Sequence, residues 1–225
     1  MTDNHYKKNN HPAIQNLDRR LYLRFGKRLF DVIVAFLALL LLVLPLSLIA
    51  LSICLTSGLP IFFTQKRVGR YGKIFYIKKF RTMVIRSEED SVITIARDTR
   101  VTPLGVYLRK WKLDELPQFW NVLVGDMSLI GPRPDVPGYA DKLQGNEARL
   151  LYLRPGITGP ATLIYKNEAE IMAQVSDPLE YKNKVIFPDK VRINLEYLET
   201  CSLSKDLYYI WQTVKEIFWR SKPKK

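Results

Sequence analysis

The chain has 225 residues, of which 35 are Lys or Arg and 22 are Asp or Glu, so its net charge is +13. This length suits one domain with or without a membrane segment, since domains commonly contain ~100–200 residues. A hydrophobic content of 47% excludes a wholly disordered protein, and a mean hydropathy of -0.10 excludes a polytopic membrane protein. The positive charge favours a partner with negative charge, such as a nucleotide phosphate, a nucleic acid or an anionic lipid.

Several classes of site lack the residues they need. Both histidines, His5 and His11, lie in a polar stretch over residues 1–16, which we expect to be a disordered tail. The two cysteines, Cys54 and Cys201, are too few for a zinc site or a disulfide framework, which fits a reducing, cytoplasmic setting. The glycines form neither a dinucleotide fingerprint nor a P-loop. Any chemistry must therefore use carboxylates, Arg and Lys, with or without an oxygen-ligated metal.

A membrane segment is predicted next to this tail. Residues 17–28 interleave basic and apolar side chains, and the 24 residues from Val32 to Leu55 carry no charge. A helix of that length extends ~36 Å, more than the ~30 Å of a bilayer's hydrocarbon core, and it exceeds the ~7–15 apolar residues of a signal peptide. We therefore divide the chain into the tail, a lead-in and membrane anchor over residues 17–56, and a cytoplasmic catalytic domain over residues 57–225.

The charges that flank the anchor predict its topology. Five basic residues lie between Leu17 and Asp31, and eight lie in residues 56–86, which contain no acid. Because positive charge favours the cytoplasmic side, both ends should be cytoplasmic. Pro45 lies inside the apolar run, where it removes a backbone hydrogen bond. We therefore predict a re-entrant helix bent at Pro45; an ordinary kinked span is the alternative.

The rest of the chain is predicted to be mainly α-helical with one small β-hairpin. Residues Ile61–Phe63 and Lys73–Phe80 flank a turn at Gly69 and Gly72. A helix should begin at Thr102 with Pro103 in its first turn. Further helices are expected over Asp114–Val124, Tyr139–Tyr152, Asn167–Val175, Asp189–Cys201 and Ser204–Arg220. The apolar face of the last helix suits either the lipid headgroup layer or the core.

The candidate chemistry centres on the adjacent acids Asp114 and Glu115. Such a pair at a helix start is usually explained by capping. Here, however, Arg109, Lys110 and Lys112 precede it, and Arg133 follows in a rigid turn, Pro132-Arg133-Pro134. Acids surrounded by fixed cations suit the binding of a diphosphate with Mg²⁺ on a carboxylate.

Five stretches of the sequence together resemble the bacterial sugar transferase family, the monotopic polyprenyl-phosphate phosphoglycosyl transferases. They occur in the family's order behind one apolar segment, and the resemblance covers roughly residues 25–214. The matching stretches are Gln65-Lys66-Arg67-Val68-Gly69, Lys79-Phe80-Arg81-Thr82-Met83, Leu113-Asp114-Glu115-Leu116-Pro117-Gln118, Asn121 to Pro134, and Arg154-Pro155-Gly156-Ile157-Thr158-Gly159.

The resemblance implies a role for each candidate residue. Asp114 matches the nucleophile that attacks the β-phosphorus of a UDP-sugar, and Glu115 matches its acidic partner associated with Mg²⁺. Arg109 and Lys79 match cationic positions of the active site. The turn of Pro132, Arg133 and Pro134 matches the one linked with the uridine nucleotide. Arg81 is either a substrate ligand or a member of a structural salt bridge.

The implied reaction transfers sugar 1-phosphate from a UDP-sugar to polyprenyl (undecaprenyl) phosphate and releases UMP. It would occur at the cytoplasmic face of the bacterial inner membrane, as the first membrane step of a surface glycan such as capsule or O-antigen. Membrane lipids are then partners, and no nucleic acid is expected. The sequence after Gly159 departs from the family's pattern, and Lys166 and Glu168 are candidates for the missing contacts. The alternative function is a non-catalytic, membrane-tethered basic module that binds nucleic acid or anionic lipid.

Overall fold

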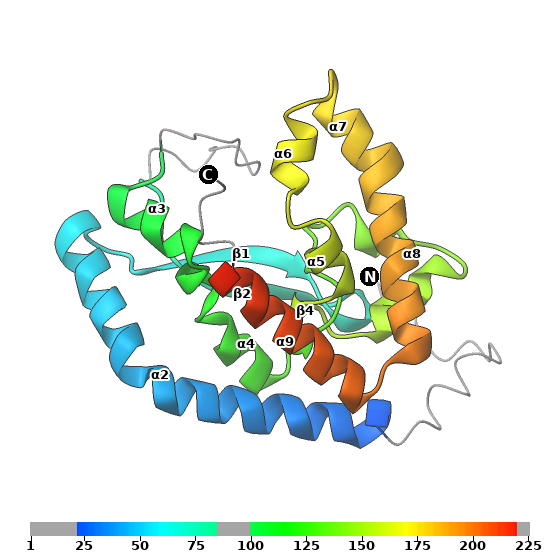
Figure 1. Ribbon diagram of the computed structural model, residues 1–225, viewed down its shortest axis with the longest axis horizontal. Coiled ribbons are helices and arrows are strands. Elements are labelled where there is room, and N and C mark those ends of the chain that lie inside the picture. Colours follow the sequence, from blue (N-terminus) through cyan, green and yellow to red (C-terminus); the bar gives the residue numbers. More distant parts are fainter. Residues whose placement is uncertain (1–21, 85–99, 220–225) are drawn as a thin grey trace, which may run out of the picture.

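The computed structural model describes residues 22–84 and 100–219, and within these it is mainly helical (Figure 1). The predicted tail and the first residues of the lead-in lie outside the described residues. After a short π-helix, η1 (Tyr22–Gly26), the chain forms the long helix α2 (Lys27–Ser57). Figure 1 shows α2 running along the base of the domain and up one side of it.

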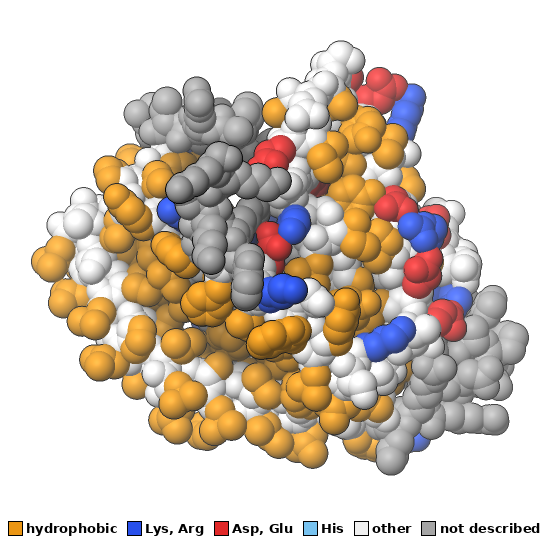
Figure 2. Space-filling view, viewed as in Figure 1, with side chains coloured by type: hydrophobic (Ala, Val, Ile, Leu, Met, Phe, Trp, Pro, Cys, Tyr) orange, Lys and Arg blue, Asp and Glu red, His pale blue; other side chains and the backbone are white. Residues whose placement is uncertain are grey.

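Helix α2 is apolar on its outer face. Among the described residues it is the one helix that, by length and composition, could cross a membrane, within the segment Tyr22–Ser57. Hydrophobic side chains cover this surface in Figure 2. The large exposed ones are Leu29, Ile33, Phe36, Leu37, Leu40, Leu41, Val43, Leu44, Leu48, Leu51 and Leu55. A surface this apolar indicates a lipid environment, since soluble proteins rarely expose large apolar patches.

Pro45 lies inside α2, which continues through it without a break. Figure 1 shows that the helix curves rather than reverses. The carbonyl freed by Pro45 belongs to Leu41, four residues earlier. The hydroxyl of the nearby Ser47 donates to the carbonyl oxygen of Val43 at 2.8 Å rather than to that of Leu41. Hydroxyl contacts of this kind with the preceding turn favour bending.

Both ends of α2 pack against the same domain. Near its start Lys27, Asp31 and Ala35, four residues apart, are buried. Near its end Ile53 is buried against Phe80 and the helix that follows the hairpin. These contacts attach both ends of the apolar helix to the same domain.

The predicted hairpin is confirmed, with a longer first strand. Strands β1 (Phe62–Val68) and β2 (Ile74–Phe80) pair antiparallel, with Phe62 opposite Phe80. The turn contains a short 3₁₀ segment, η2 (Arg70–Gly72). The predicted first strand began one residue early, at Ile61, and ended five residues early, at Phe63, because the charged residues Lys66 and Arg67 are not typical of a strand pattern.

A second small sheet joins two distant motifs. Strands β3 (Ser128–Ile130) and β4 (Gly156–Thr158) pair in parallel. A Cβ atom on Gly131 would lie 2.3 Å from the carbonyl oxygen of Arg154, and one on Gly156 would lie 2.2 Å from the Gly131 nitrogen. The close approach of these two backbones therefore requires glycine at both positions.

The helix that follows the hairpin, α3 (Pro103–Lys110), begins as predicted. The hydroxyl of Thr102 accepts from the backbone N–H of Gly105. The predicted helix over Asp114–Val124 is instead two elements, η3 (Leu113–Glu115) and α4 (Gln118–Val124). Pro117 separates them because it has no N–H to donate.

The predicted helix over Tyr139–Tyr152 was wrong. The segment forms two short 3₁₀ helices, η4 (Ala140–Lys142) and η5 (Glu147–Tyr152). Gly145 between them has a φ of 55°, a left-handed conformation that interrupts a helix.

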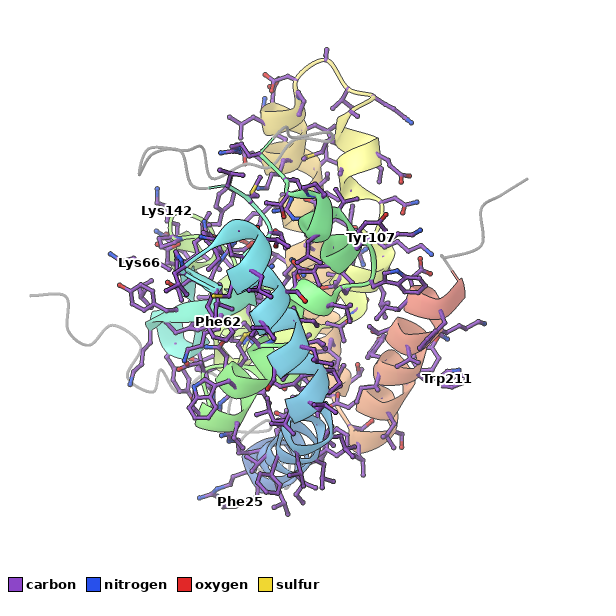
Figure 3. All side chains as sticks on the ribbon, turned by 90° about the vertical axis from the view of Figure 1, so that its left-hand side faces the viewer. Phe25, Phe62, Lys66, Tyr107, Lys142 and Trp211 are labelled. Carbon is purple, nitrogen blue, oxygen red and sulfur yellow. The ribbon has the colours of Figure 1, made fainter. Side chains whose placement is uncertain are left out.

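The carboxyl-terminal third is helical, as expected. Short helices α5 (Pro160–Ile164), α6 (Glu168–Met172) and α7 (Pro178–Tyr181) lead through a π-helix, η6 (Lys182–Ile186), to α8 (Phe187–Thr200) and α9 (Leu203–Trp219). Figure 3 shows Trp211 of α9 pointing away from the domain, and 64% of it is exposed. The outer face of α9 therefore does not contribute to the core, which favours the headgroup-layer interpretation.

The main core lies where α2, β2, α4, β3, α8 and the segments around them meet. Its buried members are Ala35, Phe75, Ile77, Val122, Met127, Leu129, Ile130, Leu153, Tyr197, Leu198 and Cys201. Asn121 is also buried and joins α4 to the hairpin. Its side-chain oxygen accepts from the N–H of Lys78 at 3.0 Å, and its amide donates to the carbonyl of Tyr76 at 2.9 Å. These bonds fix β2 relative to the acid pair that precedes α4.

Candidate active site

Asp114 and Glu115 occupy the short element η3, between α3 and α4. The chain enters it through Lys112, whose φ of 58° is left-handed and turns the backbone sharply. Both acids are buried, with 8% and 9% of their surfaces exposed. Neither η3 nor α4 receives a side-chain cap, so the capping explanation for the pair was wrong.

Glu115 is held between two cations from distant parts of the chain. One of its oxygens accepts from Lys79 Nζ on β2 at 2.7 Å and from Arg133 on the proline-flanked turn, also at 2.7 Å. Burial opposes ionisation of this carboxyl, but the charges of Arg133 and Lys79 outweigh it and hold the pKa of Glu115 below its ordinary value. Glu115 is therefore a fixed anion that orients two cations.

Asp114 is in the opposite situation. Burial and, after it, the neighbouring Glu115 carboxylate raise the pKa of Asp114 above its ordinary value. The charges of Lys79, Lys112 and Arg109 oppose this shift. One carboxylate oxygen of Asp114, Oδ1, is buried without a hydrogen-bond partner. Since buried polar atoms are nearly always paired, this oxygen is available to a ligand.

The turn that carries Arg133 is fixed from two sides. The N–H of Gly156 donates to the carbonyl of Pro132 at 2.7 Å, and a terminal nitrogen of Arg67 donates to that of Pro134 at 3.2 Å. The side chain of Arg133 is 45% exposed even though it pairs with Glu115. The turn therefore presents a guanidinium group that reaches both the acid and the solvent.

Two other predicted cations have different surroundings. Arg109 on α3 donates through Nε to the hydroxyl of Thr82 at 2.8 Å, and its charge acts on Asp114. Arg81 donates to the carbonyl oxygens of Ser57 and Gly58 at the end of α2. Within the described residues no carboxylate pairs with Arg81, so its observed contacts anchor α2. A role for Arg81 in substrate binding stays a prediction.

The candidates after Gly159 are engaged elsewhere. Lys166 pairs with Glu216 at 2.6 Å, and Glu168 pairs with Lys190 at 2.5 Å. These ion pairs link the short helices to α8 and α9.

The sequence prediction gave no role to three further residues: two support the site, and the third, Gln118, follows the acid pair at the start of α4. Asn121 and Arg67 support it through the bonds described above, and Gln118 is buried with its amide nitrogen Nε2 unpartnered. All three lie in the stretches that carried the resemblance. Their positions in those motifs are the signal that could have identified them.

The residues of the site fit a Mg²⁺ ion that takes only one or two of its ligands from the protein. In the described part of the chain no group of three or more His, Cys, Asp or Glu side chains could hold a metal. Mg²⁺ commonly takes only one or two carboxylates and completes its shell with water and phosphate oxygens. The unpartnered oxygen of Asp114, beside Glu115, is suited to that arrangement.

Comparison with known proteins confirms the resemblance. A family model described as "Bacterial sugar transferase" matches residues 22–220. The chain belongs to the bacterial sugar transferase family. Its acid pair, the cations around it and the apolar helix α2 all lie within the matched region of the family.

Curated relatives cover most of the chain. The UDP-glucose:undecaprenyl-phosphate glucose-1-phosphate transferase of Klebsiella pneumoniae is 38% identical over 194 residues, which are 84% of this chain and 39% of that protein. The protein of the same name from Escherichia coli (strain K12) is 39% identical over 198 residues, 85% of this chain and 40% of the relative.

A third relative is named for another sugar. The UDP-N-acetylgalactosamine-undecaprenyl-phosphate N-acetylgalactosaminephosphotransferase of Aeromonas hydrophila is 35% identical over 201 residues, 86% of this chain and 44% of the relative. The chain thus spans about two fifths of the length of these proteins.

Proposed function

We propose that the chain is a phosphoglycosyl transferase that moves sugar 1-phosphate from a UDP-sugar to polyprenyl phosphate and releases UMP. Family membership and the names of the relatives support this reaction. The acceptor would be undecaprenyl phosphate, and the product would begin a surface glycan. The relatives are named for different sugars, so the donor is proposed only as a class.

Asp114 is the proposed nucleophile. In the first step one of its carboxylate oxygens bonds to the β-phosphorus of the UDP-sugar. The bond from that phosphorus to the bridging oxygen breaks, and UMP leaves with the electron pair. In the second step an oxygen of polyprenyl phosphate attacks the same phosphorus and the Asp114 carboxylate leaves. The observation that carries this proposal is the buried, unpartnered oxygen of Asp114.

The surrounding residues have supporting roles in this proposal. Glu115, whose oxygen already pairs with Lys79 and Arg133, holds those cations near the reacting phosphate. The exposed part of Arg133 would bind the diphosphate, and Arg109 would add positive charge next to Asp114. Asp114 and Glu115 would hold Mg²⁺, which when bound neutralises charge on the leaving phosphate.

We also propose that α2 enters and leaves one leaflet, with both ends and the catalytic domain at the cytoplasmic face of the inner membrane. The contacts at both ends of the helix support this, because a spanning helix would put a bilayer between them. Lys27 near the start bonds to Asp206, whereas Arg81 of the domain binds the carbonyls at the end. Basic residues on both flanks favour the same side.

Cysteine labelling in intact cells tests this topology. Cysteines at His5 and Lys142 should both resist a membrane-impermeant reagent, whereas external labelling at position 5 would contradict the proposal. Pro45→Ala should straighten the helix and shift some molecules to a spanning form with position 5 outside. The native Cys54 and Cys201 are replaced by Ser in all versions.

The catalytic proposal is tested by trapping its intermediate. The protein is incubated with Mg²⁺ and a panel of UDP-sugars but no lipid. Release of UMP and a sugar phosphate adduct on the peptide that contains Asp114 are expected. Asp114→Asn should form no adduct, whereas the control Asp141→Asn, in the short helix η4, should form it normally. Salt-sensitive binding of polyanions without UMP release would favour the non-catalytic module instead.

A further inference from the structure

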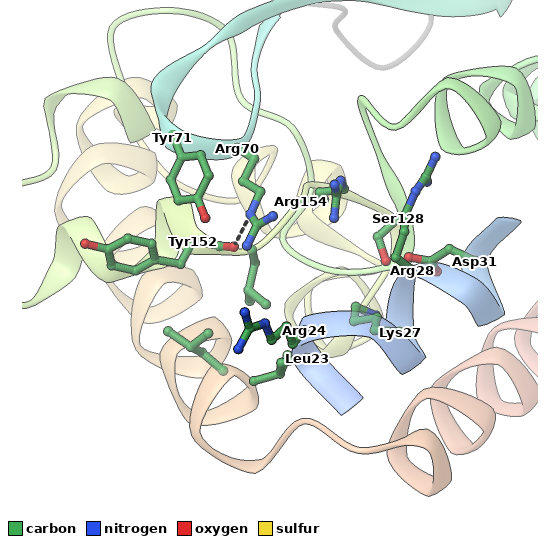
Figure 4. A pocket seen from close by; sticks show the side chains of 12 residues that line it. Leu23, Arg24, Lys27, Arg28, Asp31, Arg70, Tyr71, Ser128, Tyr152 and Arg154 are labelled. Carbon is green, nitrogen blue, oxygen red and sulfur yellow. Dashed lines mark hydrogen bonds between the residues drawn. The ribbon is translucent and has the colours of Figure 1, made fainter. Parts of the chain in front are cut away.

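A second cluster of positive charge lines a cavity at the start of α2, apart from the acid pair. The cavity has a volume of about 210 Å³, and none of the candidate active-site residues lines it. Figure 4 shows Arg24 of η1 and Arg28 at the start of α2 together with Arg70 and Arg154 from other parts of the chain. The lining contains one carboxylate, Asp31.

The guanidinium groups of this cavity outnumber its acid, because the charge of Asp31 acts on Arg154 but Asp31 forms no ion pair with it. Asp31 uses one oxygen to accept from the backbone N–H of Leu129 at 3.0 Å. Lys27, the lysine in the lining, is paired with Asp206. Within the described part of the chain none of the four arginines forms an ion pair with a carboxylate. Burial, followed by the charges of Arg70 and Arg28, lowers the pKa of Arg154, as expected where like charges converge.

Two of the arginines are held so that their outer nitrogens stay available. Arg70 donates through Nε to the carbonyl of Tyr152 at 2.8 Å, and Arg154 donates through Nε to that of Gly125 at 2.9 Å. Their terminal nitrogens have no hydrogen-bond partner among the described residues. The guanidinium group of Arg24 lies over the ring of Phe25, 5.2 Å from its centroid, and forms no ion pair or hydrogen bond with another described residue. Arg28 differs, because both of its terminal nitrogens cap the carbonyls of Val122 and Leu123 at the end of α4.

Three available guanidinium groups around one cavity suit a phosphate, whose oxygens accept paired hydrogen bonds from arginine. A cavity of about 210 Å³ is smaller than the ~300–1,000 Å³ of sites that enclose a whole small ligand, so it suits a headgroup better than a sugar nucleotide. Phe25 and Leu29, on the turns of helix beside it, are 60% and 63% exposed. Figure 3 shows Phe25 at the outer edge of the molecule.

We infer that this cavity binds the phosphate headgroup of an anionic phospholipid from the surrounding leaflet. The apolar face of α2 contacts the acyl chains, while Arg24, Arg70 and Arg154 hold the phosphate at the membrane surface. The bound lipid neutralises charge that the protein leaves unpaired. It also fixes the depth of the helix start relative to the headgroup layer. This binding site is separate from catalysis and does not depend on which sugar is transferred.

The test measures lipid retention rather than turnover. The full chain is placed in nanodiscs that contain equal amounts of phosphatidylglycerol and phosphatidylcholine, and retained lipid is counted by native mass spectrometry. The unmodified protein should retain phosphatidylglycerol in preference. Arg70→Gln with Arg154→Gln should reduce this preference about tenfold or more. Lys142→Gln, which removes one exposed charge elsewhere, should leave it unchanged.

Two further measurements separate loss of lipid binding from loss of folding, and lipid binding from binding of a soluble phosphate. Arg24→Gln, which breaks no hydrogen bond, should weaken retention without loss of folding, even if the double variant unfolds. Soluble glycerol phosphate at millimolar concentration should not displace the lipid. Equal retention of both lipids by the unmodified protein, an unchanged preference in Arg24→Gln and the double variant, or displacement by glycerol phosphate would each overturn the inference.

Discussion

Asp206 and Asp114 are both buried carboxylates close to a lysine, but their oxygens are used differently. Asp206, on α9, is fully buried and accepts from Lys27 and Tyr22 at 2.6 Å each through one oxygen. Its other oxygen accepts from Tyr197. Asp114 keeps a buried oxygen with no partner, although Lys79 lies near enough for its charge to act on the carboxyl group.

The difference separates a structural cluster from a reactive one. The Asp206 cluster joins the start of α2 to α8 and α9, and each of its carboxylate oxygens accepts at least one hydrogen bond. A buried charge that is fully hydrogen-bonded stabilises one arrangement of the helices. A buried charge with an unused oxygen carries a desolvation cost, which persists in a protein where that oxygen has a chemical role.

The largest expected effect is the loss of activity in Asp114→Asn. The amide is a poor nucleophile, so UMP release should fall by at least about 10³-fold. Stability should stay the same or rise, because the substitution removes a buried charge that the nearby cations compensate only in part. UMP release and thermal unfolding in nanodiscs measure the two effects. An active Asp114→Asn protein would remove the basis for treating the two carboxylates differently.

Asp206→Asn should show the reverse pattern. Removing one partner of a buried ion pair costs about 3–5 kcal/mol, because Lys27 is left as an unpaired charge. The same assays should record a large drop in thermal stability and normal turnover in the molecules that stay folded. Glu180→Gln, in an exposed pair with Lys184, is the matched control and should change stability by less than ~1 kcal/mol. Similar stability in the two variants would contradict the structural role of the Asp206 cluster.

Two substitutions, Arg133→Ala and Glu115→Gln, test the roles of the Glu115 ion pairs in the active site. Arg133→Ala should raise the KM for the UDP-sugar about tenfold or more, because a charged hydrogen bond contributes ~1.5–3 kcal/mol. Glu115→Gln should raise the Mg²⁺ concentration needed for activity or abolish turnover. Titration of the donor and of Mg²⁺ measures these effects. If both variants unfold instead, the ion pairs of Glu115 are chiefly structural.

The smallest expected effect concerns Asp135, beside the Arg133 turn. Burial raises its pKa to about 6, and the charges of Lys190 and Lys182 only partly oppose this. A carboxyl group with a raised folded-state pKa stabilises the fold below its unfolded pKa, and this contribution is lost as the pH rises through about 6. Asp135→Asn should therefore be more stable than the parent at pH 7, by ~1–2 kcal/mol, and equal to it near pH 4. Melting curves of both proteins at pH 4, 5, 6 and 7 measure this difference. The same difference in stability at every pH would refute the raised pKa of Asp135.

Much of the local structure follows from nearby residues. Thr102 and Pro103 specify the start of α3, because a hydroxyl cap and a first-turn proline act within one turn. The Gly69 and Gly72 turn likewise specifies the hairpin. The segment over Tyr139–Tyr152 was misjudged, since apolar spacing was given more weight than Gly145.

The sequence by itself determined the apolar helix, the acid pair and the identity of the cationic motifs, because each depends on residue types at short spacing. Only the tertiary structure decided which cations meet which acids. Lys79 reaches Glu115 across 36 positions of sequence, whereas Arg81, two residues further along, turns to the carbonyls at the end of α2. A charge interacts with its neighbours in space, and packing of the hairpin, the turn at Arg133 and the apolar helix sets those neighbours. The unpartnered oxygen of Asp114 and the arginine-lined cavity depend on that packing in the same way.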